Sequence, residues 1–232
     1  MKKILLFQWF DCKNQSRKQE LTECINHNIA IGFDEVIIFN DSVPPHFFGD
    51  KIKNVLSEHR ITYRDYINIV NNPYYYGSLV VLTNTDIKLD KNIFKLSATL
   101  SPFDFICLSR YEANGEIAPE PQDTQDTWAI ISQPMHQSVI HQSAIPLGMP
   151  GCETRFAEIL FNIGYRVFNP SLDIKCLHVQ KYPSVHKNEN RIFGAILATW
   201  PCTIAQIKAG SVNAYPRPFY YPAFVKSPLN IG

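Results

Sequence analysis

The sequence predicts an α/β domain built around a largely parallel central sheet. Short apolar runs alternate along the chain with segments whose apolar residues recur at helical spacing, as expected of strand–helix–strand units. The apolar runs are continuous rather than alternating, which is typical of strands covered by helices on both faces. The chain has 232 residues, 45% of them hydrophobic, which is enough apolar material for one core. We therefore expect a single domain over residues 1–232.

The first half of the chain shows the alternation most clearly. A helix with one apolar face is expected around Leu21–Ile29, with Gly32 placed to end it. Thr62 and Asp65 have the spacing of a capping box, which predicts a short helix after Thr62, and another helix is expected over residues 93–96. Strands are predicted over residues 4–7, 35–39, 78–82 and 103–108.

The second half is less regular. Residues 113–127 are polar and acidic and contain prolines, which predicts a long loop. A Gly/Pro turn over residues 146–151 precedes an amphipathic helix that is expected to end at Gly164. Residues 201–232 are rich in proline and aromatic residues and predict a tail packed on the body. Further strands are predicted over residues 128–131, 167–168 and 174–179.

Charge and cysteine usage exclude several classes of protein. The 22 Lys and Arg residues against 21 Asp and Glu residues give a formal charge of +1, which does not fit a general nucleic-acid binder or a polybasic membrane anchor. No apolar run approaches the length that spans a bilayer. The six cysteines show no C-x-x-C spacing, so neither a zinc motif nor a redox motif is present. These features predict a cytoplasmic protein.

Polar side chains follow three of the predicted strands. In α/β sheets, ligands gather at the carboxyl ends of the strands, because loop amides and helix N-termini converge there. These positions are therefore the first candidates for a ligand site. The candidates are Gln8, Trp9, Asp11, Asn40, Asp41, Asn84 and Asp86.

Asp86 and His178 are candidate metal ligands. A carboxylate at the end of a buried strand suits Mg²⁺ or Mn²⁺, which prefer oxygen ligands and bridge diphosphates. Asp86 would equally serve as a cap for the next turn. His178 ends a predicted strand, where a lone histidine is more often a structural hydrogen-bonding residue than a ligand.

Glu153, Arg155 and Asp126 are candidate catalytic or phosphate-binding residues. Glu153 opens the helix after the Gly/Pro turn, where it would either act as a general base or complement the helix dipole. Arg155 would neutralise a phosphate or remain a solvated helix residue. Asp126 stands in the predicted acidic loop, where a carboxylate is usually solvated.

The order of these motifs resembles that of the nucleotide-sugar-dependent glycosyltransferases of the GT-A fold, in particular the glycosyltransferase-2-like bacterial polysaccharide enzymes. The resemblance covers about residues 2–180: a strand followed by Asn84-Thr85-Asp86, a helix opening at Glu153, and a strand ending at His178. It implies that Asp86 is the last Asp of an Asp-x-Asp motif and binds Mn²⁺ or Mg²⁺ together with His178. Asn84 stands where the first Asp is usual, which is a departure from the family.

The resemblance also implies roles for the other candidates. Glu153 would be the base of an inverting reaction, with Asp126 in reserve because Thr154 occupies the position of the usual second acid. Arg155 would face a phosphate, and residues 8–11 and 40–41 would lie against the nucleotide. Residues 1–110 would form the nucleotide-sugar-binding half and residues 111–200 the acceptor half.

The implied function is transfer of a hexosyl or N-acetylhexosaminyl group from a nucleotide-diphosphate sugar, most simply a UDP-sugar, to a glycan or lipid-linked acceptor. Such an enzyme would lie in the cytoplasm or peripherally at the inner face of the membrane. A sugar nucleotidyltransferase is disfavoured because no glycine follows the first strand. A glycoside hydrolase could use Asp126 and Glu153 as its two carboxylates, but it leaves Asn84-Thr85-Asp86 unexplained. A catalytically degenerate nucleotide- or carbohydrate-binding protein of the same fold is the alternative.

Overall fold

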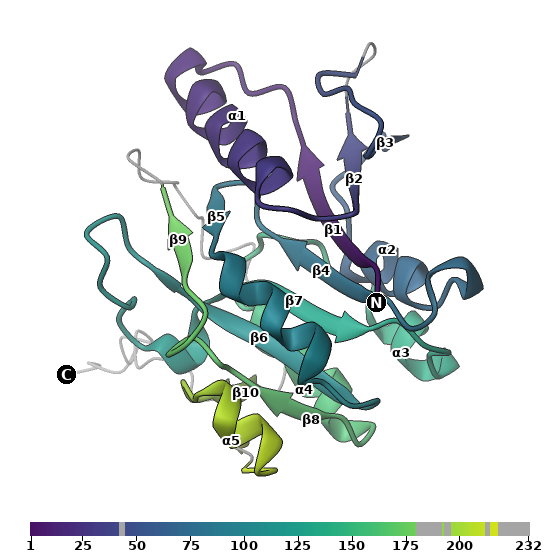
Figure 1. Cartoon of the computed structure of the whole chain (residues 1–232), viewed down its shortest axis with the longest axis vertical. Coiled ribbons are helices and arrows are strands. Elements are labelled where there is room, and N and C mark those ends of the chain that lie inside the picture. Colours follow the sequence, from purple (N-terminus) through teal and green to yellow (C-terminus); the bar gives the residue numbers. More distant parts are fainter. Residues whose placement is uncertain (42–44, 180–191, 193–195, 212–213, 218–232) are drawn as a thin grey trace, which may run out of the picture.

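The computed structural model describes residues 1–41, 45–179, 192, 196–211 and 214–217 (Figure 1). The strands of the main sheet are β1 (Lys3–Trp9), β2 (Glu35–Asn40), β3 (Ile52–Leu56), β4 (Leu79–Thr83), β5 (Ile87–Leu89), β6 (Asp104–Tyr111), β7 (Gln125–Ile131), β8 (Arg166–Phe168) and β9 (Cys176–His178). A separate antiparallel pair is formed by β10 (Ile196–Thr199) and β11 (Ala214–Arg217). The helices are α1 (Gln15–Ala30), α2 (Tyr63–Val70), α3 (Gln137–Gln142), α4 (Cys152–Asn162) and α5 (Ile204–Lys208), with 3₁₀ turns η1 (Pro73–Tyr75), η2 (Lys91–Ala98) and η3 (Pro121–Asp123).

The main sheet is mixed but mostly parallel, which confirms the predicted fold class. Its strand order is β3-β2-β1-β4-β7-β6-β9-β5, with β8 also paired to β6. The pairs β1–β2, β2–β3, β1–β4, β6–β8 and β6–β9 are parallel. The antiparallel pairs are β4–β7, β6–β7 and β5–β9. Because β7 lies between β4 and β6, the sheet runs through both predicted halves, and their division at residue 110 stays a prediction.

Helices cover both faces of this sheet, so its central strands are buried on both sides. Along β1, Ile4 and Leu6 pack on one face and Leu5 and Phe7 on the other, as the period of two in a strand requires. The first face is covered by α2, α3 and α4, and the second by α1, η2 and α5 (Figure 1). This double burial explains why the strands are continuous apolar runs in the sequence.

The capping box predicted for α2 is present. The Thr62 backbone N–H donates to the Asp65 carboxylate at 2.7 Å, and the Asp65 N–H faces back toward the Thr62 side chain. The helix then buries Tyr63, Tyr66, Ile67 and Val70 against the sheet. Capping and burial together fix the start of α2, and the neighbouring Ile61 N–H donates to the Gln8 side chain near the carboxyl end of β1.

The prediction of one loop over residues 113–127 is wrong at its end. Residues 125–127 belong to β7, where Thr127 pairs with Thr83 of β4 and with Leu108 of β6. The strand extends into a polar stretch because it is held between two neighbouring strands rather than by its own apolar residues. Strands β3 and β5 and helix α3 were also absent from the sequence-based prediction.

The predicted tail of residues 201–232 is described only in part. Helix α5 packs Ile207 into the core, and β11 pairs with β10, while residues 212–213 and 218–232 lie outside the described residues. Within the described ranges, no helix has the length and apolar character needed to cross a membrane.

Candidate functional site

A cavity of about 700 Å³ opens where the carboxyl ends of β1, β2 and β4 meet the start of α4. It lies where polar loop residues of a largely parallel sheet are expected to converge on a ligand. Seven of the candidate residues line it, and they come from segments up to 170 residues apart in the chain, between positions 8 and 178. These are Gln8, Asp41, Asn84, Asp86, Asp126, Glu153 and His178.

The local pairing of β4, β5 and β9 brings Asp86 and His178 together. After β4 ends at Thr83, the Asn84 N–H donates to the carbonyl of Asp126 on β7 at 3.0 Å. Ile87 of β5 then pairs with His178 of β9, and the Val179 N–H donates to the Asp86 carbonyl at 3.0 Å. The side chains of Asp86 and His178 are therefore neighbours by register.

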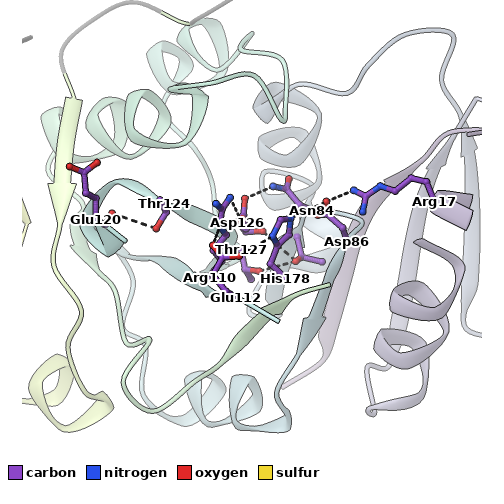
Figure 2. Close-up of polar contacts among 11 residues, drawn as sticks. Arg17, Asn84, Asp86, Arg110, Glu112, Glu120, Thr124, Asp126, Thr127 and His178 are labelled. Carbon is purple, nitrogen blue, oxygen red and sulfur yellow. Dashed lines mark hydrogen bonds and ion pairs between the residues drawn. The ribbon is translucent and has the colours of Figure 1, made fainter. Parts of the chain in front are cut away.

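Asp86 is the centre of a network of alternating charges (Figure 2). One carboxylate oxygen, Oδ2, contacts Arg17 Nη2 at 2.5 Å and His178 Nε2 at 3.3 Å. His178 Nδ1 lies 3.7 Å from Glu112, which accepts a hydrogen bond from Arg110 Nε at 3.0 Å. The network thus joins α1, the loop after β4, and the ends of β6 and β9.

These contacts shift the protonation of Asp86 and His178 in opposite directions. Burial acts to raise the pKa of Asp86, but hydrogen bonds and charge from His178 and Arg17 outweigh it and lower the pKa to about 2. Burial acts to lower the pKa of His178, but the bond and charge of Asp86 outweigh it and raise the pKa. The geometry therefore favours a carboxylate beside a protonated imidazole.

Asp126 lies in β7 and not in a solvated loop, which corrects the expectation from the sequence. Its side chain is only 14% exposed. It accepts a hydrogen bond from Asn84 Nδ2 at 2.6 Å, and Arg110 Nη1 lies 3.7 Å away. Burial, and secondly the negative charge of Asp86, raise the pKa of Asp126. A carboxyl with a raised pKa in a cavity is suited to proton transfer.

Glu153 stands in the first turn of α4 and lines the cavity. The chain enters the helix through Gly151, whose φ of 82° is left-handed and favours glycine. Thr154, the next residue, is buried, and its hydroxyl donates to the Gly151 carbonyl. Glu153 and not Thr154 is therefore presented to the cavity.

Four candidates do not line the cavity. The Trp9 ring is 1% exposed and stacks on His46 with ring centroids 4.7 Å apart, so it packs in the core. Asn40 is buried, with its amide 3.4 Å from that of Asn54. Asp11 is exposed and contacts Lys18 at 2.6 Å. Arg155 pairs with Glu158 one turn along α4.

Gln8 lines the cavity but also holds the loop that follows β3. Its amide Nε2 donates to the His59 carbonyl at 3.2 Å, and its Oε1 accepts from the Ile61 N–H at 3.1 Å. Arg60, between them, donates to the Leu147 carbonyl at 3.0 Å and so joins this loop to the turn before α4. The side chain of Gln8 thus positions one rim of the cavity.

Arg17 and Arg110 line the cavity and were not predicted from the sequence. A signal for Arg17 is present in the helical spacing, because Arg17, Leu21, Cys24 and Asn28 fall on one face of α1. Leu21, Cys24 and Asn28 are buried, so an arginine on that face has to reach a polar partner. Arg110 carries no comparable signal.

The described side chains do not fit a divalent cation at Asp86. Magnesium and manganese need several oxygen ligands around one point. Here the guanidinium of Arg17 lies 2.5 Å from one of the two carboxylate oxygens of Asp86, and Asn84 supplies an amide rather than a second carboxylate. Among the residues whose placement is described, no group of three His, Cys, Asp or Glu side chains is arranged to hold a metal.

No protein-family model matches this chain, and no curated protein matches it. Among solved structures, the chain is similar to a protein from Desulfovibrio desulfuricans G20 that is provisionally named a nucleotide-diphospho-sugar transferase. The two share 12% sequence identity at a TM-score of 0.46, and the match covers 73% of this chain and 80% of that chain. A likeness this distant carries no argument about activity, which has to be inferred from the cavity itself.

Proposed function

We propose that this protein is a glycosyltransferase that moves a sugar from a nucleoside-diphosphate donor to a hydroxyl of a glycan or lipid-linked acceptor. One observation supports the proposal above others: a single cavity at the carboxyl ends of the parallel strands combines Asp86 and its basic partners with Glu153. The basic partners suit a diphosphate, and a carboxylate at a rigid helix start suits proton abstraction.

In the proposed reaction, the acceptor oxygen attacks C1 of the sugar while the bond between C1 and the diphosphate oxygen breaks. The electron pair of that bond goes to the leaving diphosphate, whose negative charge grows. The hydroxyl proton passes to the Glu153 carboxylate, with Asp126 as the reserve base. A single displacement of this kind inverts the configuration at C1. The step needs positive charge beside the diphosphate and exclusion of water from C1.

The finer assignments are part of the same proposal. We place the nucleotide against Gln8 and Asp41, near the ends of β1 and β2, and the diphosphate near Asp86. A UDP-sugar carrying a hexosyl or N-acetylhexosaminyl group is the simplest donor. The prediction that Asp86 and His178 hold Mn²⁺ or Mg²⁺ is not part of this proposal, because the contact of Arg17 with Asp86 does not suit a cation site, and no step above depends on a metal.

A binding screen followed by a rate measurement tests this function. Thermal shift with UDP, GDP, CMP and their sugars identifies the donor, because a ligand bound only by the folded state raises the melting temperature. With that donor and a set of simple glycans, Glu153→Gln is expected to lower the rate of nucleotide release by about 10²- to 10⁴-fold. Its affinity for the nucleotide should match that of wild type.

The outcomes of this screen separate the alternatives. Binding of a nucleotide sugar without turnover would indicate a catalytically degenerate binding protein. An unchanged rate in Glu153→Gln would remove this residue as the base and direct attention to Asp126. Absence of binding by every nucleotide would contradict the glycosyltransferase proposal and leave hydrolysis of glycans to be tested.

A further inference from the structure

We infer that Arg17 supplies the positive charge that meets the donor's diphosphate, that Asp86 is the positioning residue for its guanidinium, and that nucleotide binding therefore needs no divalent cation. This inference rests on the proposed function and deepens it. It changes the role predicted for Asp86 from metal ligand to partner of a protein cation.

The first argument is the contact itself. Arg17 Nη2 lies 2.5 Å from Asp86 Oδ2, and Arg17 Nη1 lies 3.1 Å from Glu20 Oε2. Figure 2 shows the contact between Arg17 and Asp86. The Arg17 side chain is 18% exposed and lines the cavity, so its guanidinium is held by two carboxylates and is reachable from within the cavity. A guanidinium has five N–H donors in a planar fork, and these two contacts use two of them. The fork geometry that remains suits phosphate oxygens.

The second argument is the position of Arg17 in its helix. It stands in the first turn of α1, a helix of 16 residues whose cap, Asn14, accepts a hydrogen bond from the Arg17 N–H at 3.1 Å. The amino end of a helix carries partial positive charge and favours an anion. The amino end of α1, from which Arg17 reaches the cavity lining, thus adds partial positive charge to that of the guanidinium.

The third argument is the charge of the whole lining. It includes three arginines, Arg17, Arg60 and Arg110, together with His178, against five carboxylates. The lining therefore has no general positive field, and a diphosphate depends on individual well-placed cations. Arg60 is bonded to backbone carbonyls, and Arg110 is bonded to Glu112 on the other side of His178. Arg17 is the arginine that contacts Asp86 directly, at the end of β4.

Calorimetric titration of UDP and GDP, each with EDTA and with Mn²⁺, tests the inference. Wild type should bind the preferred nucleotide with the same Kd in both buffers. Arg17→Gln should bind about 10- to 100-fold more weakly, because it loses charged hydrogen bonds to the phosphates. Arg17→Lys keeps the positive charge but not the planar arrangement of N–H donors, so its nucleotide affinity should lie between those of wild type and Arg17→Gln. The matched control is Arg64→Gln, which removes a guanidinium bonded to backbone carbonyls of α3, outside the cavity lining.

Each outcome decides a different question. Two results would overturn the role of Arg17 and leave the proposed function standing. One is nucleotide binding by wild type only when Mn²⁺ is present. The other is wild-type nucleotide affinity in an Arg17→Gln variant that still shows a melting transition. If Arg17→Gln fails to fold, the role of Arg17 is still tested by the nucleotide affinity of Arg17→Lys and by the comparison of wild-type binding in EDTA and in Mn²⁺. No binding of either nucleotide by wild type in either buffer would contradict the proposed function, and the inference with it.

Discussion

Two carboxylates in this domain, Glu35 and Asp86, are each held between two basic side chains, yet they lie at opposite ends of the sheet. Glu35 opens β2 and contacts Lys2 and Lys53, both at 2.8 Å. Asp86 follows β4 and contacts Arg17 and His178. In both cases burial acts to raise the pKa of the acid and hydrogen bonds to basic groups outweigh it, so the pKa is lowered.

What separates the two is the environment of the basic partners. Lys2 and Lys53 are 37% and 50% exposed and reach over Glu35 from the surface, whereas Arg17 and His178 are 18% and 10% exposed and line the cavity. We therefore expect the ion pairs of Glu35 to serve stability and those of Asp86 to serve the proposed ligand binding. The position at the carboxyl ends of the strands, rather than the ion pair, indicates a functional site.

Among the substitutions that test this comparison, the largest expected effect comes from Asp86→Ala. It should lower the rate of transfer by about 100-fold or more, because Arg17 and His178 both lose the group that orients them for the diphosphate. Glu35→Gln serves as the matched control and should leave transfer at the wild-type rate. Nucleotide release with the donor identified by the screen measures both. If folded Asp86→Ala transfers sugar at the wild-type rate, neither Asp86 nor Glu35 takes part in the reaction, and the two carboxylates do not differ in function.

Glu35→Gln should instead lower the free energy of unfolding, by about 1–3 kcal/mol, because charged hydrogen bonds to Lys2 and Lys53 are lost at a buried position. Urea denaturation of wild type and variant measures the change. An unchanged midpoint would show that these lysines are too exposed for the pair to contribute.

The stability that Glu35 contributes should depend on pH in one direction. Its pKa is lower in the folded state than its ordinary value of 4.5, so the folded state holds the ionised form more strongly. The contribution is therefore complete above about pH 4.5 and is lost as the pH falls through the folded-state pKa. The difference between wild type and Glu35→Gln should shrink on acidification, as followed by denaturation at several pH values. A difference that grows at low pH would contradict the assignment.

The smallest effect is expected from Tyr75→Phe. The Tyr75 hydroxyl donates to Glu35 Oε1 at 2.6 Å, and its loss should cost about 0.5–1.5 kcal/mol of stability without changing nucleotide affinity. Thermal unfolding and calorimetric titration measure the two quantities. A loss of nucleotide affinity in this variant would show that the amino ends of the strands are coupled to the cavity.

Much of the fold was readable from the sequence, because its central strands are continuous apolar runs. Strand β3 was missed because it lies at the sheet edge, where none of its residues is fully buried, and β5 was missed because three residues are too few to show a pattern. The end of the 113–127 loop was misjudged because β7 is stabilised by its neighbours and not by its own composition. Tertiary pairing of this kind has no local signal.

The sequence allowed the location of the candidate site to be predicted, because polar residues follow the predicted strands. It did not allow the contacts between the side chains of the site to be predicted. Gln8, Asp41, Asn84 and Asp86 do lie at one cavity because the carboxyl ends of parallel strands meet there. The contact between Arg17 and Asp86 joins residues 69 positions apart, and only the docking of α1 on the sheet decides it. Trp9 was misjudged because side chains alternate along β1 and its own points into the core.

The placement of β7 between β4 and β6 has a consequence for the order in which the protein is made. While the ribosome extends the chain from its N-terminus, β4 and β6 emerge before the strand that joins them, so the sheet stays in two pieces until residue 131 is available. His178 follows later still, on β9. The cavity is therefore complete only after His178 has been made, and nucleotide capture by nascent chains of increasing length would test at which length binding begins.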